Sequence, residues 1–242
     1  MDFPDEMTRV ELDNSVVATL KSIADPYMTA LKEERRQGIE SFVAHKVHSL
    51  IYPMRATSED VEFSKQNLWV VDERLAYHWY LASDRTLSSL KVVNAKGGDE
   101  PDIVVFNTPR AFTESTSPYQ SVVLVEFKRP ERNEYPTKEE DPVEQILRYV
   151  RKIKAGEAKD KDGKTFTVST IPFYAYILCS LTPRMRSIAE NRDFTRMPDN
   201  EGYFLYHQNA GCYIEIMSYD KVLNDAKKRN RAFFERLQLP IA

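Results

Sequence analysis

The chain has 242 residues, of which 42% are hydrophobic and 29% are charged, and its formal net charge is −3. This length allows one sizeable core, as a single large domain or as a domain with a helical appendage. The weakly acidic balance excludes a protein that is basic overall, so nucleic-acid binding would need a local basic cleft.

The cysteine content and the hydropathy indicate the cellular compartment of the protein. Cys179 and Cys212 each lie inside an apolar segment, which predicts buried core thiols rather than a disulfide framework. No apolar run approaches the roughly 20 residues of a membrane span, and no secretory signal pattern precedes the first helix. We therefore expect a cytoplasmic protein that does not contact a membrane.

The N-terminal part of the sequence has helical character. Residues 1–24 are polar and mixed, and they form either a helix or an irregular lead-in. Apolar residues then recur at helical spacing over residues 27–51, and Pro53 ends this helix. We expect an N-terminal helical region over residues 1–65, serving dimerisation or sensing, ahead of a main domain over residues 66–242.

Two histidines lie three residues apart on the helix over residues 27–51. His45 and His48 share a face, which is the arrangement of a metal-binding pair. A zinc site needs further ligands, and no cysteine or third histidine lies nearby in the sequence. The pattern therefore favours ordinary surface or packing histidines.

The segments that follow alternate between periodic and turn-rich stretches. Residues 72–81 are strongly aromatic and predict a helix that packs Leu75, His78 and Trp79 against a sheet. Residues 90–93 predict a short strand, and the glycines at 97 and 98 a turn. The loop over residues 108–120, which carries Arg110, is interpreted as a plain connection rather than as a border of a substrate cleft.

Two short apolar strands over residues 101–106 and 121–128 organise the chain. Both are rich in β-branched residues, which is typical of strands inside a sheet covered on both faces. Asp102 opens the first strand, and Glu126 and Lys128 close the second, sharing one face while Phe127 points to the other. Buried charges without partners are costly, so their convergence predicts a hard-cation site beside a general base. The simpler alternative is a Glu126–Lys128 ion pair at a strand end.

A helix follows this charged strand end. Asp141 is placed to cap it and Pro142 to be its first residue. Gln145 and Tyr149, four residues apart, run along the flank of its apolar stripe and face either the charged strand ends or a polar margin. The stripe consists of Val143, Ile146, Leu147, Val150 and Ile153.

The C-terminal part predicts strands and two helices. Residues 172–181 form a third buried strand, a short helix starts at Thr182, and residues 202–206 and 212–217 flank a hairpin turn at 209–211. The last helix, over residues 219–237, carries a basic run that favours a solvated face over phosphate contact. This run consists of Lys227, Lys228, Arg229 and Arg231. Residues 160–163 lack the ligand spacing of a calcium loop.

Asp102 followed by Glu126-Phe127-Lys128 resembles the PD-(D/E)xK nuclease superfamily, with its restriction-endonuclease-like fold. Gln145 and Tyr149 resemble the Q-x-x-x-Y element of some branches, and the combination is similar to Shedu-type antiviral-defence nuclease domains. The resemblance covers residues 66–220. It implies an α/β fold with a mixed β-sheet core flanked by helices.

The resemblance also implies a chemistry. One or two Mg²⁺ ions, for which Mn²⁺ can substitute, would be held by Asp102, Glu126 and the main-chain carbonyl of Phe127. Lys128 would orient or deprotonate the attacking water, with Gln145 and Tyr149 positioning it. Related nucleases carry a glutamate on the first core helix. Glu73 is the best match and Glu40 its rival, although Glu73 is equally well explained as a first-turn carboxylate.

Two functions from different classes follow. The first is a Mg²⁺-dependent nuclease, an endonuclease of DNA in defence against phage or plasmid. Arg129 would then contact the nucleic-acid backbone. The second is a module that keeps the fold without cutting and binds nucleic acid or a partner protein. A homo-oligomer or a regulatory partner domain is compatible with either function.

Overall fold

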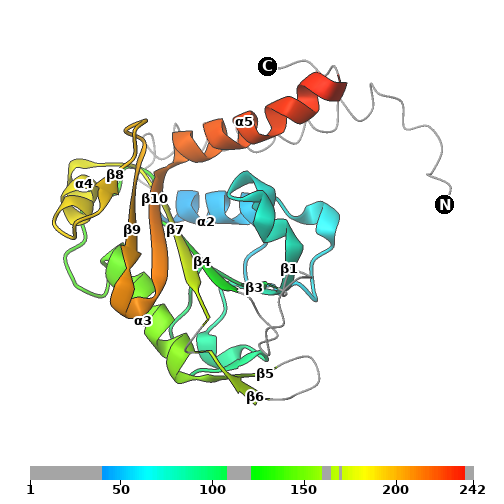
Figure 1. Ribbon diagram of the computed structural model, residues 1–242. Helices are drawn as coiled ribbons and strands as arrows, with labels where there is room; N and C mark the ends of the chain where they lie inside the picture. The colour runs from blue at the N-terminus through cyan, green and yellow to red at the C-terminus, as the bar shows by residue number, and fades with distance from the viewer. Residues whose placement is uncertain (1–39, 108–120, 160–164, 169–170, 238–242) are drawn as a thin grey trace.

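The computed structural model describes residues 40–107, 121–159, 165–168 and 171–237. The predictions for residues 1–39, for the loop with Arg110 and for residues 160–163 lie outside these ranges. The described chain is an α/β structure with an open, mixed seven-stranded sheet between helices (Figure 1). The expected α/β class is therefore confirmed.

The large sheet has the strand order β1-β3-β4-β7-β10-β9-β8. The central strands β4, β7 and β10 are parallel, whereas β1 and β3 on one side and β9 and β8 on the other pair antiparallel. The strands are β1 His78–Ser83, β3 Ile103–Asn107, β4 Ser121–Phe127, β7 Phe173–Cys179, β8 Thr195–Arg196, β9 Gly202–His207 and β10 Cys212–Ser218. A smaller antiparallel sheet consists of β2 Val93–Asn94, β5 Glu157–Lys159 and β6 Thr165–Thr167.

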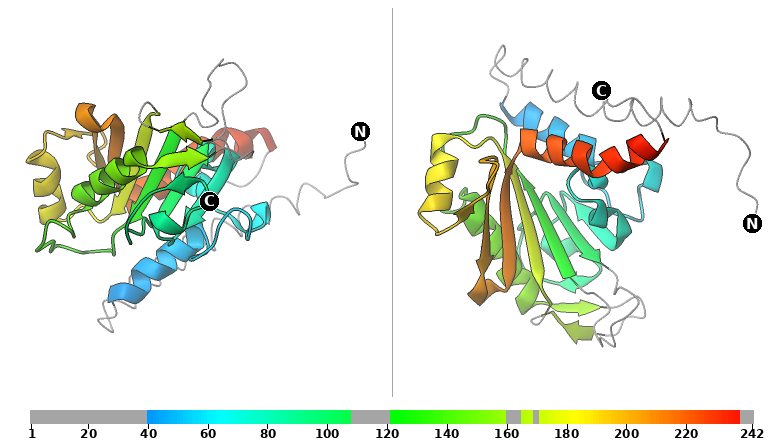
Figure 2. Two further views of the ribbon diagram at one scale, coloured as in Figure 1. Left: turned by 90° about the horizontal axis from the view of Figure 1, so that it is seen from below. Right: turned by 45° about the horizontal axis from the view of Figure 1, so that its top comes forward.

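Helices cover both faces of the large sheet, with α2 and α3 on opposite sides (Figure 2). Val122 and Leu124 of β4 pack in the same core cluster as α3 and α4, whereas Val123 and Val125 pack with α2 and α5. Burial on both faces explains why β4 is a nearly continuous apolar run. The helices are α2 Glu40–Ile51, α3 Pro142–Ala155, α4 Pro183–Glu190 and α5 Tyr219–Leu237.

The start of α3 forms as the sequence predicts. The Asp141 carboxylate accepts hydrogen bonds from the backbone N–H groups of Val143 and Glu144 at 3.0 and 3.1 Å, and Pro142 is the first helical residue. Such a cap stabilises a helix by about 1 kcal/mol. It fixes where α3 begins, and therefore which residues face the sheet.

The predicted helix over residues 72–81 is wrong. Residues 73–77 form the short 3-10 helix η3 Glu73–Tyr77, and the chain then enters β1. Tyr80 and Ala82 pack on the α3 face and Leu81 on the other, which is the alternation of a strand. Pairing with β3 and burial on both faces override the helical spacing of Leu75, His78 and Trp79.

Further short elements complete the fold. Of the strand predicted over residues 90–93, only Val93 lies in a strand, in the small sheet. The hairpin between β9 and β10 is confirmed, with Gly211 in the left-handed region at φ 56°. The remaining 3-10 helices are η1 Phe63–Lys65, η2 Leu68–Val70, η4 Leu87–Ser89 and η5 Gln208–Ala210.

Helix α2 belongs to the expected N-terminal helical region, and its Val47 and Ile51 pack into the core on the α5 side of the sheet. The division of the chain at residue 65 stays a prediction. Among the helices that the structure describes, none combines the length and the apolarity needed to span a membrane.

Candidate active site

Asp102 and Glu126 meet where β3 begins and β4 ends. These strands are antiparallel with Ile103 opposite Val125, so the residues one step further, Asp102 and Glu126, also face each other. The backbone N–H of Phe127 donates to Asp102 Oδ2 at 2.6 Å, which holds the carboxylate against the end of β4. The register of two strands therefore brings together carboxylates that lie 24 positions apart in the sequence.

Lys128 joins the strand end to α3. Its Nζ donates to Glu126 Oε1 and to Gln145 Oε1, each at 2.5 Å. The Lys128 and Glu126 side chains are only 5% and 7% exposed. Glu126, Lys128 and Gln145 therefore share the α3 face of the sheet, as the alternation along β4 predicts.

The backbone of Lys128 is fixed from two directions. Its N–H donates to the carbonyl of Leu178 at 2.8 Å, which extends the β4–β7 pairing by one residue. Its carbonyl accepts a hydrogen bond at 2.5 Å from the hydroxyl of Tyr219, the first residue of α5. The sequence gives no signal for this second anchor, because Tyr219 lies 91 positions away.

Glu126 has one carboxylate oxygen that does not contact Lys128. Its Oε2 is buried and has no hydrogen-bond partner among the described residues. Leaving a buried acceptor unsatisfied costs about 1–3 kcal/mol, and more for a charged group. An orphaned carboxylate oxygen beside a second carboxylate is a position that suits a cation.

The electrostatic environment of Asp102 also favours a bound cation. Burial, and after it the nearby Glu126 carboxylate, raise the pKa of Asp102 well above its usual value, whereas Lys128 and the Phe127 N–H oppose this shift. The Asp102 side chain keeps 26% of its surface exposed, so it remains open to solvent. Two carboxylates that disfavour each other's charge gain most from a shared cation.

Tyr149 is placed differently from Gln145. Its buried hydroxyl donates to the carbonyl of Glu100 at 3.3 Å, and among the described residues it makes no hydrogen bond to Lys128. Burial, then the charges of Glu126 and Asp102, raise the pKa of Tyr149. Tyr149 thus fixes the backbone two residues before Asp102.

Replacing Tyr149 by phenylalanine should lower the free energy of unfolding by about 0.5–1.5 kcal/mol, because the hydrogen bond from the buried Tyr149 side chain to the Glu100 carbonyl is lost. Urea denaturation measures this loss. Tyr77→Phe is the matched control, since the Tyr77 side chain is exposed, and it should change stability by less than about 0.5 kcal/mol. A Tyr149→Phe variant as stable as wild type would contradict the anchoring role.

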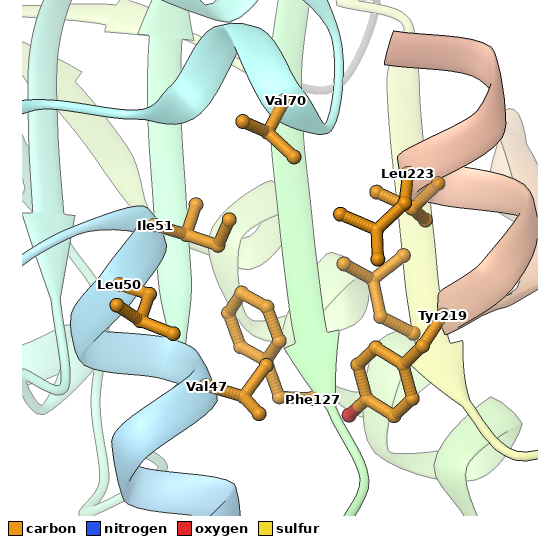
Figure 3. A pocket seen from close by; sticks show the side chains of 9 residues that line it. Val47, Leu50, Ile51, Val70, Phe127, Tyr219 and Leu223 are labelled. Carbon is orange, nitrogen blue, oxygen red and sulfur yellow. The ribbon is translucent and has the colours of Figure 1, made fainter. Parts of the chain in front are cut away.

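Phe127 places its side chain on the face opposite to Lys128. The ring helps to line an apolar pocket of about 30 Å³ between α2 and α5 (Figure 3). Its other lining residues are Val47, Leu50, Ile51, Val70, Leu178, Tyr219, Val222 and Leu223. The role expected for the Phe127 carbonyl as a metal ligand stays a prediction.

Glu73 is engaged elsewhere. Its Oε2 pairs with Arg229 Nε at 2.9 Å, and its side chain is 60% exposed. Within the described residues it forms no hydrogen bond or ion pair with Asp102, Glu126 or Lys128. Arg229 also donates to the backbone carbonyls of Trp69, Val70 and Val71, at the end of η2, so this part of the basic run attaches α5 to the body of the protein. Glu40 is the first residue of α2, and its side chain lies outside the description.

His48 reaches the candidate site from α2. Its Nε2 lies 2.7 Å from Ser83 Oγ, its Nδ1 lies 3.9 Å from Asp102 Oδ1, and its ring stacks on Phe127 with a centroid separation of 5.0 Å. Burial lowers the pKa of His48 to about 4, against the opposing effect of Asp84, so the ring is neutral at pH 7. The three-residue spacing of His45 and His48 draws attention to His48 in the sequence, but it does not reveal that His48 lies against Ser83, Asp102 and Phe127.

The donor set fits a hard cation with few protein ligands. Within the described ranges, no three His, Cys, Asp or Glu side chains are gathered as a ready-made metal centre. Mg²⁺ is commonly bound by one or two carboxylates and retains several waters, which Asp102 and the free oxygen of Glu126 satisfy. Comparisons of the chain with protein-family models, curated proteins and solved structures found no match.

Proposed function

We propose that this protein is a metal-dependent nuclease of the restriction-endonuclease-like fold that hydrolyses phosphodiester bonds of DNA. The observation that carries the proposal is the buried contact of Lys128 Nζ with Glu126 and Gln145, beside a Glu126 oxygen that has no partner among the described residues. The order α2, β1, β3, β4, α3, β7 around this cluster also supports it. Defence against foreign DNA is the setting that the resemblance to Shedu-type domains implies.

Each residue of the candidate site has a separate role in the proposed reaction. Asp102 and Glu126 would hold Mg²⁺ or Mn²⁺, which when bound offsets phosphate charge and activates water. Lys128 has three N–H donors and gives two of them to Glu126 and Gln145, so the third can orient the attacking water or a phosphate oxygen. Gln145 fixes the Lys128 side chain, and Tyr149 fixes the backbone leading to Asp102.

A structural ion pair is the simpler explanation for Lys128 and Glu126. Such a pair accounts for one oxygen of Glu126 and leaves the second buried and unsatisfied. It also leaves unexplained why Asp102, a further carboxylate, is held beside them by a backbone N–H. The nuclease proposal accounts for all three groups, because phosphodiester hydrolysis needs both cation ligands and a positioned ammonium or amine.

Incubation with supercoiled plasmid, linear DNA and RNA, in Mg²⁺, Mn²⁺ or EDTA, tests the proposal. We expect nicked and linear plasmid with either metal and no cleavage in EDTA. DNA that is bound but left intact with both metals would contradict the nuclease and establish the non-cutting module instead. Cleavage of RNA alone would contradict the proposed substrate.

A further inference from the structure

The carbonyl of Lys128 lies where the pairing of β4 with β7 stops. Phe127 pairs with Leu178, and the Lys128 N–H still donates to the Leu178 carbonyl at 2.8 Å. A parallel ladder would continue with a hydrogen bond from the Ser180 N–H to the Lys128 carbonyl. Among the described residues, no backbone group makes this bond. A buried carbonyl at this position therefore requires a donor from outside the ladder.

Tyr219 supplies that donor. Its hydroxyl donates to the Lys128 carbonyl at 2.5 Å, and Tyr219 is only 5% exposed. Figure 3 shows this hydroxyl directed toward the end of β4, where Phe127 lies. Both rings line the apolar pocket between α2 and α5, so the hydrogen bond lies in apolar surroundings, where it is stronger than in water.

The position of Tyr219 is fixed by the residue before it. Ser218, the last residue of β10, lies opposite Cys179 of β7, and its N–H donates to the Glu201 carbonyl at 2.9 Å. The Ser218 hydroxyl donates to the Glu201 carboxylate at 2.8 Å and accepts the Lys221 N–H at 2.9 Å. The contact with Lys221 is a helix cap, which sets the residue at which α5 begins. Tyr219 therefore starts α5 at a defined place beside the end of β4.

We infer that Tyr219 is a positioning residue for Lys128, through which α5 sets the place of the Lys128 ammonium group. This inference rests on the proposed function and adds a residue that acts through Lys128 rather than on the substrate. Glu126 and Gln145 hold Lys128 Nζ, and Tyr219 holds the backbone from which that side chain starts. Without the hydroxyl the end of β4 can shift, and a displacement of about 1 Å in an active site can cost about 10²-fold in rate.

Replacing Tyr219 by phenylalanine keeps the ring in the core and removes only the hydroxyl. We expect the single-turnover rate of DNA cleavage at saturating Mn²⁺ to fall about 10-fold. The dissociation constants for DNA and for Mn²⁺ should change less than about 2-fold, because the variant retains every group that would contact them. The loss therefore falls on the chemical step and not on binding.

Tyr176→Phe is the matched control for a purely structural effect. Tyr176 is 6% exposed, and its hydroxyl donates to Asp72 at 2.6 Å, outside the candidate site. Both variants lose one buried hydrogen bond, so each should lower the Tm by about 2–4 °C, but only Tyr219→Phe should slow cleavage. Tyr52→Phe removes a buried hydroxyl that has no partner among the described residues, and it should change neither quantity. Equal slowing in Tyr219→Phe and Tyr176→Phe would overturn the inference.

Nuclear magnetic resonance observes the Lys128 carbonyl without requiring cleavage. The sequence contains two Lys–Arg peptide bonds, Lys128–Arg129 and Lys228–Arg229. A carbonyl–amide correlation spectrum of the full chain, labelled with carbonyl-¹³C lysine and ¹⁵N arginine, therefore contains two signals. We expect the Lys128 carbonyl signal to shift in Tyr219→Phe and to stay in place in Tyr176→Phe, with the Lys228 signal unchanged in both. An unmoved Lys128 signal in Tyr219→Phe, or equal movement of both signals, would overturn the inference.

The two readouts separate this inference from the proposed function. Metal-dependent cleavage that Tyr219→Phe retains at the wild-type rate would overturn the positioning role and leave the nuclease standing. A Lys128 carbonyl shift confined to Tyr219→Phe, in a protein that binds DNA without cutting it, would support the anchor and overturn the nuclease.

Discussion

Replacing Lys128 by alanine should lower the rate of DNA cleavage about 10²–10⁴-fold, the range that a positioned proton donor or acceptor contributes. The reason is geometric. Lys128 Nζ is buried and held by Glu126 and Gln145 beside the two carboxylates. A solvent-exposed lysine elsewhere on the protein therefore cannot replace it. Single-turnover cleavage of a labelled duplex at saturating Mn²⁺ measures the chemical step.

The control for this variant is Lys91→Ala. Lys91 also pairs with a glutamate, Glu59, at 2.8 Å, but the lysine side chain is 75% exposed. Its removal should leave the rate unchanged. Because Lys128→Ala leaves Glu126 buried without its cation, Lys128→Met, which retains most of the side-chain packing, serves as a second variant, and circular dichroism establishes that each is folded. Cleavage by folded Lys128 variants at the wild-type rate would contradict the assigned role.

Replacing Asp102 by asparagine should abolish cleavage and also stabilise the metal-free protein. The pKa of Asp102 is raised in the folded chain, so the folded state binds this proton more tightly than the unfolded state. Its contribution to stability is therefore full below the unfolded pKa of about 3.9 and is lost as pH rises through the folded pKa. At pH 7 the ionised Asp102 carboxylate therefore destabilises the folded wild type, whereas an uncharged asparagine does not.

Without metal, we expect the free energy of unfolding of Asp102→Asn to exceed that of wild type by about 0.5–2 kcal/mol. Each kcal/mol should raise the Tm by about 2–4 °C. Mn²⁺ should raise the Tm of wild type and leave that of the variant almost unchanged, because a ligand stabilises only a protein that binds it. Thermal unfolding with and without Mn²⁺ measures both effects.

Asp199→Asn is the control for the sign of this effect. Its hydrogen bond with Lys221 lowers the pKa of Asp199, so the Asn variant should gain no stability at pH 7 and should keep the metal response. A metal-free Asp102→Asn variant that is less stable than wild type at pH 7, but still responds to Mn²⁺, would contradict the assignment of Asp102 as a ligand.

The parts of the site predicted from sequence are those governed by local rules. Alternation along a strand places Glu126 and Lys128 on one face, and the Asp141 cap sets where α3 begins. The sequence leaves two positions open for Gln145, and the structure selects the one against Lys128. The apolar runs of β4 and β7 identify central strands before their neighbours are known. These features depend on at most a few consecutive residues.

The parts not predicted depend on long-range packing. Residues 78–83 have a mixed pattern that fits a helix or a strand, and only pairing with β3 selects the strand. The expectation for Glu73 depended on the same mistaken helix, and the structure pairs this side chain with Arg229. His48 meets Asp102 only because α2 docks against the end of β4, an arrangement that no local pattern encodes.

The measurement that tests the central claim most directly is cleavage of supercoiled plasmid in Mn²⁺ by wild type and by folded Lys128→Met, purified in parallel. We expect nicked and linear products from wild type that EDTA prevents, and intact plasmid with Lys128→Met over the same time. Equal cutting by both proteins, or none by wild type with any divalent metal, would contradict a metal-dependent nuclease site built on Asp102, Glu126 and Lys128.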